Sequence, residues 1–169
     1  HLGLHQLDAI VVSHGHQDHI AGLVAAMEKW SVDRLYWNGA TEDSSTFQEL
    51  LQTALKTVIE LKTVERGDQL PFGDLEVQVL HPGDLSGDTN GDSIVLRAGC
   101  QGAWLYLPGD SGAAAEKQMA ATNQLEPVQI LHTAHHGSQY STSTTLLDAL
   151  GAQDAIISAG RTNSYGHPH

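Results

Sequence analysis

Apolar runs alternate with amphipathic segments along the chain, and this pattern predicts an α/β domain. Residues 7–13, LDAIVVS, form a continuous apolar run with the length of a strand that is buried on both faces. Residues 21–30 carry apolar side chains at helical spacing, and residues 44–57 begin with Ser and have one apolar face. Further strands are predicted at 34–37, 75–81, 92–98, 103–108, 128–133 and 154–160, and further helices at 113–121 and 143–150.

The order of these elements predicts how they are layered. Strands alternate with helices at both ends of the chain, and a run of strands lies between, which is typical of an α/β layered domain with a mixed sheet. The sequence of 169 residues contains neither a repeat nor a low-complexity linker, so we expect one domain over residues 1–169. Motifs rich in Gly, Asp and His follow the predicted strands, where open α/β sheets bind their ligands.

The segment SHGHQDH, residues 13–19, places several metal-binding side chains after the first predicted strand. His14 and His16 are two residues apart and share one face if the backbone is extended. Asp18 and His19 follow on the next turn. Imidazole suits zinc, iron, nickel or manganese, and a carboxylate beside it favours manganese or iron. Four candidate ligands within six residues predict a metal site rather than a polar turn at the start of a helix, and their spacing permits two neighbouring metal ions.

Charge and cysteine content limit the class of function. The chain has 20 acidic and 8 basic residues and a formal net charge of -12, which argues against broad electrostatic binding of nucleic acid. The excess of acidic residues does not exclude a nuclease, because bound divalent cations supply positive charge where a phosphate would lie. The one cysteine, Cys100, excludes an internal disulfide and a cysteine-rich zinc module. No apolar run approaches the roughly 18 residues that span a bilayer, so we expect this segment to be soluble.

Four motifs occur in an order that resembles one superfamily of hydrolases. H-x-H-x-D-H is followed by NGDSIVLRAGCQGAWLYLPGD, LHTAHHGSQYSTSTTLLDAL and AIISAGRTNSYGHPH. Together they resemble the metallo-β-lactamase superfamily, and most closely the C-terminal metallo-β-lactamase-like domain of the competence protein ComEC/Rec2 and its stand-alone relatives. The resemblance extends from about residue 7 to residue 169. It implies an α/β fold of the αββα sandwich type, and whether this chain is complete at both ends stays open.

The resemblance also implies a ligand set. It implies His14 and His16 on a first divalent metal ion, and Asp18 and His19 on a second, with zinc or manganese as the expected ions. Asp110, at the end of LPGD, would be the bridging carboxylate and would orient the attacking water. The alternative for Asp110 is a cap of the helix predicted at 113–121.

Two further histidine motifs add candidates. His135 and His136 are adjacent, and on an extended backbone they would point in opposite directions, so we expect one metal ligand and favour His136. The other would bind a ligand carboxylate or a phosphate through a hydrogen bond. His167 lies in a Gly-His-Pro turn and is expected at the metal or the substrate. Any of these three rings is a candidate to protonate the leaving alkoxide.

Four residues are candidates for contact with the substrate or for the wall of its site. Ser138 could donate a hydrogen bond to phosphate oxygens, although a role at the start of the next helix is an equal alternative. The guanidinium of Arg161 matches phosphate oxygens, with a plain surface charge as its alternative. Tyr140 and Tyr165 lie beside the histidine motifs and are candidates for the wall of the site.

One departure from the superfamily concerns the first metal. Many members have a further histidine ligand between the first motif and the bridging aspartate. Here that interval holds only His81, which we predict to be structural at the end of a strand. Asn90 and Asp92 occupy the corresponding region, so the first metal has fewer protein ligands than usual.

These observations predict a metal-dependent hydrolase that uses a metal-activated water. The resemblance favours a phosphodiesterase or nuclease that degrades DNA during competence-linked DNA uptake. It also implies a membrane channel in the same parent chain, with this domain attached to the bacterial cytoplasmic membrane and facing its outer side. Two alternatives stay open. One is a stand-alone cytoplasmic hydrolase of a small ester, thioester or phosphoester, and the other is a non-catalytic domain of a DNA transport machine.

Overall fold

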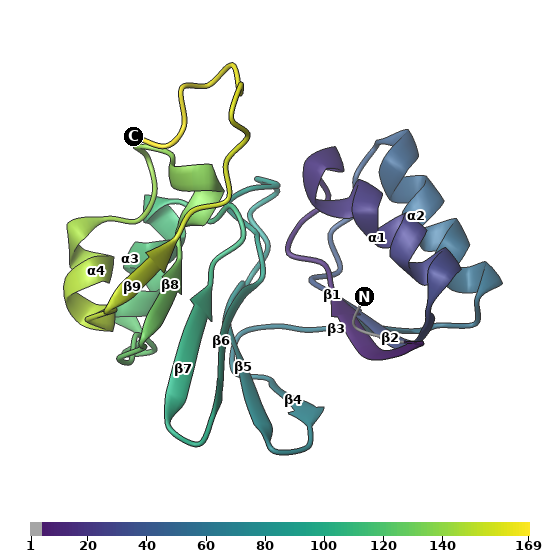
Figure 1. The fold of residues 1–169 in the computed structure, drawn as a ribbon, viewed down its shortest axis with the longest axis horizontal. Helices are drawn as coiled ribbons and strands as arrows, with labels where there is room; N and C mark the ends of the chain where they lie inside the picture. Colours follow the sequence, from purple (N-terminus) through teal and green to yellow (C-terminus); the bar gives the residue numbers. More distant parts are fainter. Residues whose placement is uncertain (1–4) are drawn as a thin grey trace. The chain divides into compact units, whose positions relative to one another are not determined.

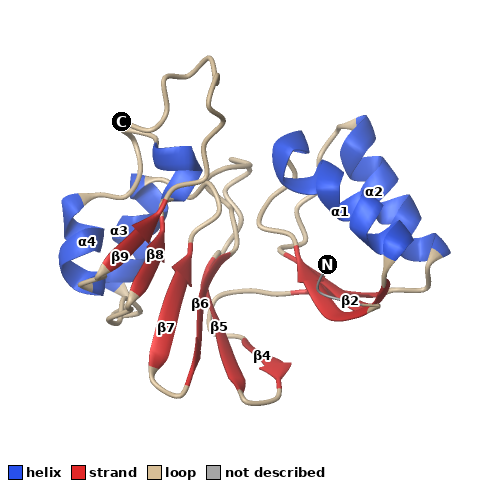
Figure 2. Cartoon of the chain, in the orientation of Figure 1, coloured by secondary structure: helices blue, strands red, loops and turns tan. Residues whose placement is uncertain are grey.

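A computed structural model describes residues 5–169 and divides the chain into two compact units. Unit 1 ends at Val64, and unit 2 is Glu65–His169 (Figure 1). Both units combine strands with helices, which Figure 2 distinguishes by colour. The described residues contain four α-helices. The predicted mixed α/β class is therefore observed, while the assignment of residues 1–169 to a single domain stays a prediction.

Unit 1 contains a three-stranded parallel sheet and two helices. The sheet has the order β1–β2–β3, formed by β1 (Gln6–Val11), β2 (Ser31–Trp37) and β3 (Glu60–Thr63). Parallel neighbours need a crossover connection, and α1 (Gln17–Lys29) and α2 (Ser45–Lys56) supply the two crossovers. The helices lie side by side over one face of the sheet (Figure 1).

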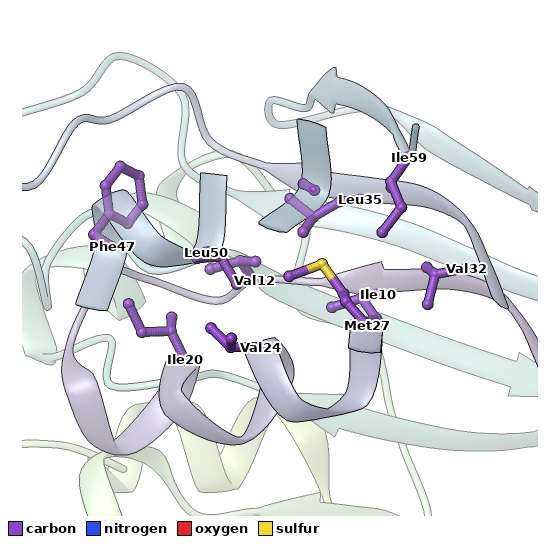
Figure 3. Packing of buried hydrophobic residues seen from close by; sticks show 11 residues of the cluster. Ile10, Val12, Ile20, Val24, Met27, Val32, Leu35, Phe47, Leu50 and Ile59 are labelled. Carbon is purple, nitrogen blue, oxygen red and sulfur yellow. The ribbon is translucent and has the colours of Figure 1, made fainter. Parts of the chain in front are cut away.

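Side chains from both helices and from the sheet form the core of unit 1 (Figure 3). The predicted helix at 44–57 is confirmed, and the hydroxyl of Ser44 caps it by accepting a hydrogen bond from the Phe47 N–H at 3.2 Å. The buried apolar residues are Ile10, Val12, Ile20, Val24, Met27, Val32, Leu35, Phe47, Leu50, Ala54 and Ile59. Their removal from water is the main force that holds α1 and α2 on the sheet.

Two features of unit 1 differ from the predictions. The first helix begins at Gln17, four residues before the start of the predicted segment 21–30, so Asp18 and His19 lie in its first turn. The first strand is not buried along its whole length, because Gln6 and Asp8 are exposed, whereas Ile10, further along the same face, is buried. The apolar run alone could not show that the helices of this unit cover one face only.

Unit 2 contains a six-stranded mixed sheet with the order β4–β5–β6–β7–β8–β9. Its strands are β4 (Gln69–Phe72), β5 (Leu75–His81), β6 (Val95–Cys100), β7 (Ala103–Leu107), β8 (Ile130–His132) and β9 (Asp154–Ile156). Strands β4 to β7 are antiparallel, and β7, β8 and β9 are parallel to one another. Helix α3 (Ala113–Ala121) connects β7 to β8, and α4 (Thr144–Leu150) connects β8 to β9.

The core of unit 2 joins both helices to the sheet. Its buried residues are Leu80, Val95, Tyr106, Ala115, Met119, Val128, Leu131, Leu146 and Leu150. The bounds of β5 and α3 agree with the predicted segments 75–81 and 113–121. Strands β3 and β4 were not predicted, because each has four residues and a pattern too short to establish a period.

The topology of unit 2 brings three sequence motifs to one edge of its sheet. Since β7, β8 and β9 are parallel neighbours, their carboxyl ends lie at the same edge. LPGD follows β7, HTAHHGS follows β8, and the loop 157–169 follows β9. This is the position at which open α/β sheets bind ligands. Within the described part of the chain, no helix has both the length and the apolar character that a membrane span requires.

Candidate metal centre

The first cluster consists of His14, His16, Asp18 and His19 in unit 1. The connection between β1 and α1 brings its rings together: the ring centroid of His14 lies 4.8 Å from that of His16 and 4.2 Å from that of His19. His14 is 3% exposed, whereas His16 and Asp18 are exposed. The carboxylate of Asp18 lies in the first turn of α1, where the helix dipole favours negative charge.

The hydroxyl of Ser13 is in contact with two rings of the first cluster. Its Oγ lies 3.2 Å from Nδ1 of His14 and 3.5 Å from Nδ1 of His19. A ring that donates its Nδ1–H to this oxygen keeps a lone pair on Nε2, which is the tautomer that a metal ion requires. Such a bond would favour the metal-binding form of the neighbouring histidine.

The second cluster consists of Asp110, His135, His136 and His167 in unit 2. Oδ2 of Asp110 lies 3.8 Å from Nε2 of His135 and 3.8 Å from Nε2 of His136. The ring of His167 lies 5.9 Å from the ring of His135, measured between centroids. Asp110 is 4% exposed, so these imidazoles surround a carboxylate that is largely withdrawn from water. Three segments that are distant in sequence supply this one group of ligand atoms.

The backbone at His135 and His136 is not extended, which corrects the premise that only one ring points inward. Their φ angles are 49° and 56°, and both residues lie in the short turn η1 (Ala134–Gly137). Left-handed geometry at two successive residues turns both rings to the side of Asp110. Sequence reasoning assumed a continued strand, whereas β8 ends at His132.

His136 has the tautomer of a metal ligand. Its Nδ1 lies 2.8 Å from the carbonyl oxygen of Ser158, and a carbonyl oxygen only accepts, so Nδ1 carries the proton. In the neutral ring the lone pair is then on Nε2, the atom that faces Asp110. A carbonyl behind the ring is the common partner of metal-binding histidines.

The environment of His167 also favours the neutral ring. Loss of hydration lowers its pKa below the ordinary value, and the rings of His169, His135 and His136 lower it further, while Asp110 opposes them. A neutral imidazole keeps the lone pair that a metal ligand needs.

The backbone of Asp110 is held by a buried hydroxyl, and Asp110 is not the N-cap residue of α3. Its N–H donates to Oγ of Ser93 at 3.2 Å, and Ser93 is fully buried. The cap position of α3 is Gly112, where no side chain accepts a hydrogen bond from the helix. The N–H of His135 donates to the carbonyl of Gly109 at 3.1 Å, which joins η1 to the LPGD segment.

His81 and Asp92 have structural contacts. Nε2–H of His81 donates to the carbonyl of Gly91 at 2.8 Å, as expected for a residue that fixes a strand end. The carboxylate of Asp92 accepts hydrogen bonds from the N–H and hydroxyl of Ser86 at 2.9 and 2.8 Å, and from the Gly87 N–H at 2.8 Å. The NGDS motif therefore organises its own loop, and its Ser93 supports Asp110.

A pocket of about 360 Å³ lies within unit 2. Its walls come from the loop 81–92, from the start of α3 and from Tyr140. Asp110 and His135 also line it, so part of the second cluster faces this space. Asp84 and Asp88 also line the pocket and add negative charge to its wall.

The candidate substrate contacts differ in exposure. Ser138 is buried, and its hydroxyl accepts a hydrogen bond from the Tyr140 N–H at 3.3 Å, while Ser143 caps α4. Tyr165 is 76% exposed, and its ring stacks on that of His167 at 5.7 Å between centroids and an interplanar angle of 15°. Arg161 is exposed, and within residues 5–169 no hydrogen bond or ion pair joins it to the second cluster.

Sequence reasoning missed two supporting residues. Glu116 is buried on α3, and its carboxylate accepts hydrogen bonds from the N–H groups of Thr142 at 2.6 Å and Ser143 at 2.9 Å. Asn163 binds four backbone groups of the loop 157–169 through its amide. A signal for Asn163 exists, since Asn commonly binds backbone two residues ahead in a loop. Glu116 offered none, because an acidic residue in an Ala-rich helix is typical of a solvated face.

A family model described as the metallo-beta-lactamase superfamily matches residues 1–161. The chain belongs to this superfamily. It is 32% identical over 168 residues to ComE operon protein 3 of Bacillus subtilis (strain 168), across 99% of this chain and 22% of that protein. It is 28% identical over 170 residues to Competence protein ComA of Neisseria gonorrhoeae, across 98% of this chain and 22% of that protein. The chain thus spans about a fifth of the length of these relatives.

Solved structures agree with the fold. The metallo-beta-lactamase fold protein YhfI from Bacillus subtilis aligns with a TM-score of 0.54 and 18% identity, across 90% of this chain and 68% of that chain. The predicted fold class is therefore confirmed. The chain is thus a metallo-β-lactamase-fold domain related to competence proteins, and this fold implies binding of divalent metal. The donors of the second cluster fit that metal, because a carboxylate and two imidazoles converge and one ring has the required tautomer.

Proposed function

We propose that the protein is a metal-dependent phosphodiesterase that cleaves DNA. The observation that supports this proposal best is the convergence of His135 and His136 on the buried carboxylate of Asp110, each at 3.8 Å. A buried acid beside two imidazoles is suited to hold a hard or borderline cation and to handle protons at neutral pH. Exposed Tyr165 stands next to this group through its stacking on His167.

Each cluster contains proposed ligands of divalent metal. In the first they are His14, His16, Asp18 and His19, and in the second they are Asp110, His136 and His167, with zinc or manganese as the expected ions. When bound, a divalent cation lowers the pKa of a water molecule to near neutrality and polarises the phosphoryl oxygens.

Individual side chains then have separate tasks. The carboxylate of Asp110 accepts a hydrogen bond from the attacking water and orients it. His136 is held as a ligand by its Nδ1–H bond to Ser158. This leaves His135, next to the same carboxylate oxygen, to protonate the leaving alkoxide.

Nucleic acid is favoured as substrate by the relatives and by the surface near the second cluster. One relative is named a competence protein, and the relatives are several times as long as this chain. We propose that the domain works on DNA beside a membrane channel of the same parent chain, at the bacterial cytoplasmic membrane. Arg161 and Ser138 would contact phosphate oxygens, and Tyr165 would stack on a base.

A cleavage assay tests the proposal. End-labelled single-stranded and double-stranded DNA are incubated with the folded protein and Mn²⁺, Zn²⁺ or Mg²⁺. We expect cleavage with manganese or zinc, and its loss with a chelator and in the variant Asp110→Asn. Asp148→Asn, on the exposed face of α4, is the matched control that removes the same charge elsewhere. Absence of cleavage with every metal, in protein shown to be folded, contradicts the proposal.

The pocket of unit 2 favours a second candidate function. Its volume of about 360 Å³ is that of a small-molecule site, and Asp84 and Asp88 in its wall repel a polyanion. The candidate is hydrolysis of a small ester, thioester or phosphoester. Chromogenic esters, thioesters and bis-phosphodiesters distinguish the two functions. If the protein cleaves DNA, Asp88→Asn should raise its affinity for DNA. If it hydrolyses a small substrate, the same change should alter only the KM for that substrate.

A further inference from the structure

The side-chain amide of Asn163 uses its full hydrogen-bonding capacity within one loop. Nδ2 donates to the carbonyl oxygens of Gly160 at 2.7 Å and His167 at 2.8 Å. Oδ1 accepts hydrogen bonds from the N–H groups of Tyr165 at 3.1 Å and His167 at 3.0 Å. An Asn side chain offers two donors and one oxygen with two lone pairs, so all four are engaged. Both backbone polar groups of His167 are bound by this single amide.

The loop around Asn163 has few other restraints. After β9 ends at Ile156, residues 157–169 form neither helix nor strand. Other backbone bonds in the loop join the Asn163 N–H to Gly160 at 3.1 Å, and the His169 N–H to Gly137 at 2.9 Å. The amide of Asn163 therefore replaces the ladder of hydrogen bonds that would fix a residue in a strand.

His167 differs from His136 in how its ring is oriented. The ring of His136 is held directly, by the carbonyl of Ser158 on Nδ1. Nδ1 of His167 is buried and has no hydrogen-bond partner within residues 5–169. The ring of His167 contacts other rings, with Tyr165 stacked on one side and His169 edge-on at 5.3 Å. Its direction therefore depends on the backbone that Asn163 holds.

We propose that Asn163 is the positioning residue that presents the His167 ring to the second cluster, and this proposal rests on the proposed metal-binding function. The amide fixes both backbone groups of His167, and the ring then lies 5.9 Å from the ring of His135. Asn163 itself contacts no metal or substrate. It acts through His167, in the way that second partners of metal ligands set ring orientation.

Metal affinity, measured without DNA, tests the proposal. Titration calorimetry with Zn²⁺ and with Mn²⁺ compares the wild type, Asn163→Ala and Ser164→Ala, the last being exposed in the same loop. We expect Asn163→Ala to weaken metal binding by about 10- to 100-fold, the range seen when a partner of a ligand is removed. Ser164→Ala should bind metal as the wild type does. Equal affinities in all three proteins overturn the proposal.

Two further variants separate positioning from a general effect on the fold. In the background His167→Ala, the change Asn163→Ala should no longer alter metal affinity, because the ring that it positions is absent. The same loss in both backgrounds overturns the proposal. Asn163→Asp keeps the two acceptor bonds to Tyr165 and His167 but sets a carboxylate oxygen against the carbonyl oxygens of Gly160 and His167, so it should weaken metal binding at least as much as Asn163→Ala. This variant also serves if Asn163→Ala does not fold.

Failure of this proposal is distinguishable from failure of the proposed function. If metal affinity depends on Asn163 through His167 but no DNA is cleaved, the positioning role stands and the nuclease function fails. If DNA is cleaved and metal affinity is independent of Asn163, the nuclease function stands and the positioning role fails.

Discussion

The two clusters of candidate ligands are built in different ways. The first lies within one short stretch, where β1 leads into α1, and its rings are neighbours because they are neighbours in sequence. The second combines residues that follow β7, β8 and β9, and parallel pairing of these strands brings them together. A local motif can be recognised directly in the sequence. An assembled cluster depends on supporting residues such as Ser93, Glu116 and Asn163, which carry no ligand atom.

The largest expected effect comes from the carboxylate at the centre of the second cluster. Asp110→Asn keeps the shape of the side chain and removes the charge that faces two imidazoles. Loss of a group that only hydrogen-bonds a metal ligand lowers metal affinity or activity by about 10- to 100-fold. Since Asp110 is itself a proposed ligand, we expect metal-dependent hydrolysis to fall by more than about 100-fold. Metal content by elemental analysis and steady-state rates provide the measurement. Activity within about threefold of wild type would show that the second cluster is not essential.

The next effect concerns support of the second cluster without a change in its ligands. Glu116→Ala leaves the partly buried N–H groups of Thr142 and Ser143 without their acceptor, and loss of the partner of a fully buried N–H costs about 1–3 kcal/mol. We expect the free energy of unfolding, measured in urea, to fall by roughly 2 kcal/mol or more. Lys117→Ala, exposed on the same helix, is the control. Unchanged stability in Glu116→Ala would mean that water replaces the carboxylate.

A smaller effect is expected from pH, through His81 in the loop beside the pocket. Burial lowers the pKa of His81 below its ordinary value of 6.5, so the unfolded chain takes up this proton at a higher pH than the folded protein does. The contribution of neutral His81 to stability is complete above pH 6.5 and is lost as the pH falls from 6.5 towards the lowered pKa. His81→Gln should therefore have a weaker dependence of the urea midpoint on pH between 7.5 and 5. The lowered pKa of His167 acts in the same direction and leaves a residual slope.

The smallest effect is expected at the exposed Arg161. Arg161→Ala should weaken DNA binding a few-fold and reduce the slope of log affinity against log salt by about 1, as removal of one phosphate contact does. Fluorescence anisotropy of labelled single-stranded DNA at several salt concentrations measures this slope. Lys56→Ala removes the same charge from α2 in unit 1 and should leave the slope unchanged. If both variants change it equally, the effect comes from net charge rather than from a site.

Local features of the fold and of the first cluster could be predicted from the sequence. The bounds of α3 and β5 follow from short-range patterns. The spacing of the four candidate metal ligands in SHGHQDH is enough to recognise them. Helix α1 began earlier than predicted because its first turn is polar, and polar residues there obscure the helical period.

Features that depend on tertiary contacts could not be predicted. We expected His135 and His136 to point in opposite directions on an extended backbone, but their left-handed backbone turns both rings towards Asp110. No local pattern in HTAHHGS indicates this backbone conformation. Burial of Glu116 arises only when α3 meets the segment before α4. The carboxylate of Asp92 accepts hydrogen bonds from the Ser86 and Gly87 N–H groups of its own loop. Asp92, which lies in the region where a further ligand was expected, therefore has a structural role.

The turn at residues 135–137 also restricts how this site could be redesigned. Three successive residues have positive φ, namely His135 at 49°, His136 at 56° and Gly137 at 80°. Asn, Asp and His adopt such angles several-fold more often than other residues with a side chain, whereas β-branched residues are outliers there. An exchange of either histidine for Asp or Asn keeps the backbone, while Val, Ile or Thr adds roughly 1–2 kcal/mol of strain. A library that aims to change the metal preference of this turn is therefore limited to a few amino acids before any ion is considered.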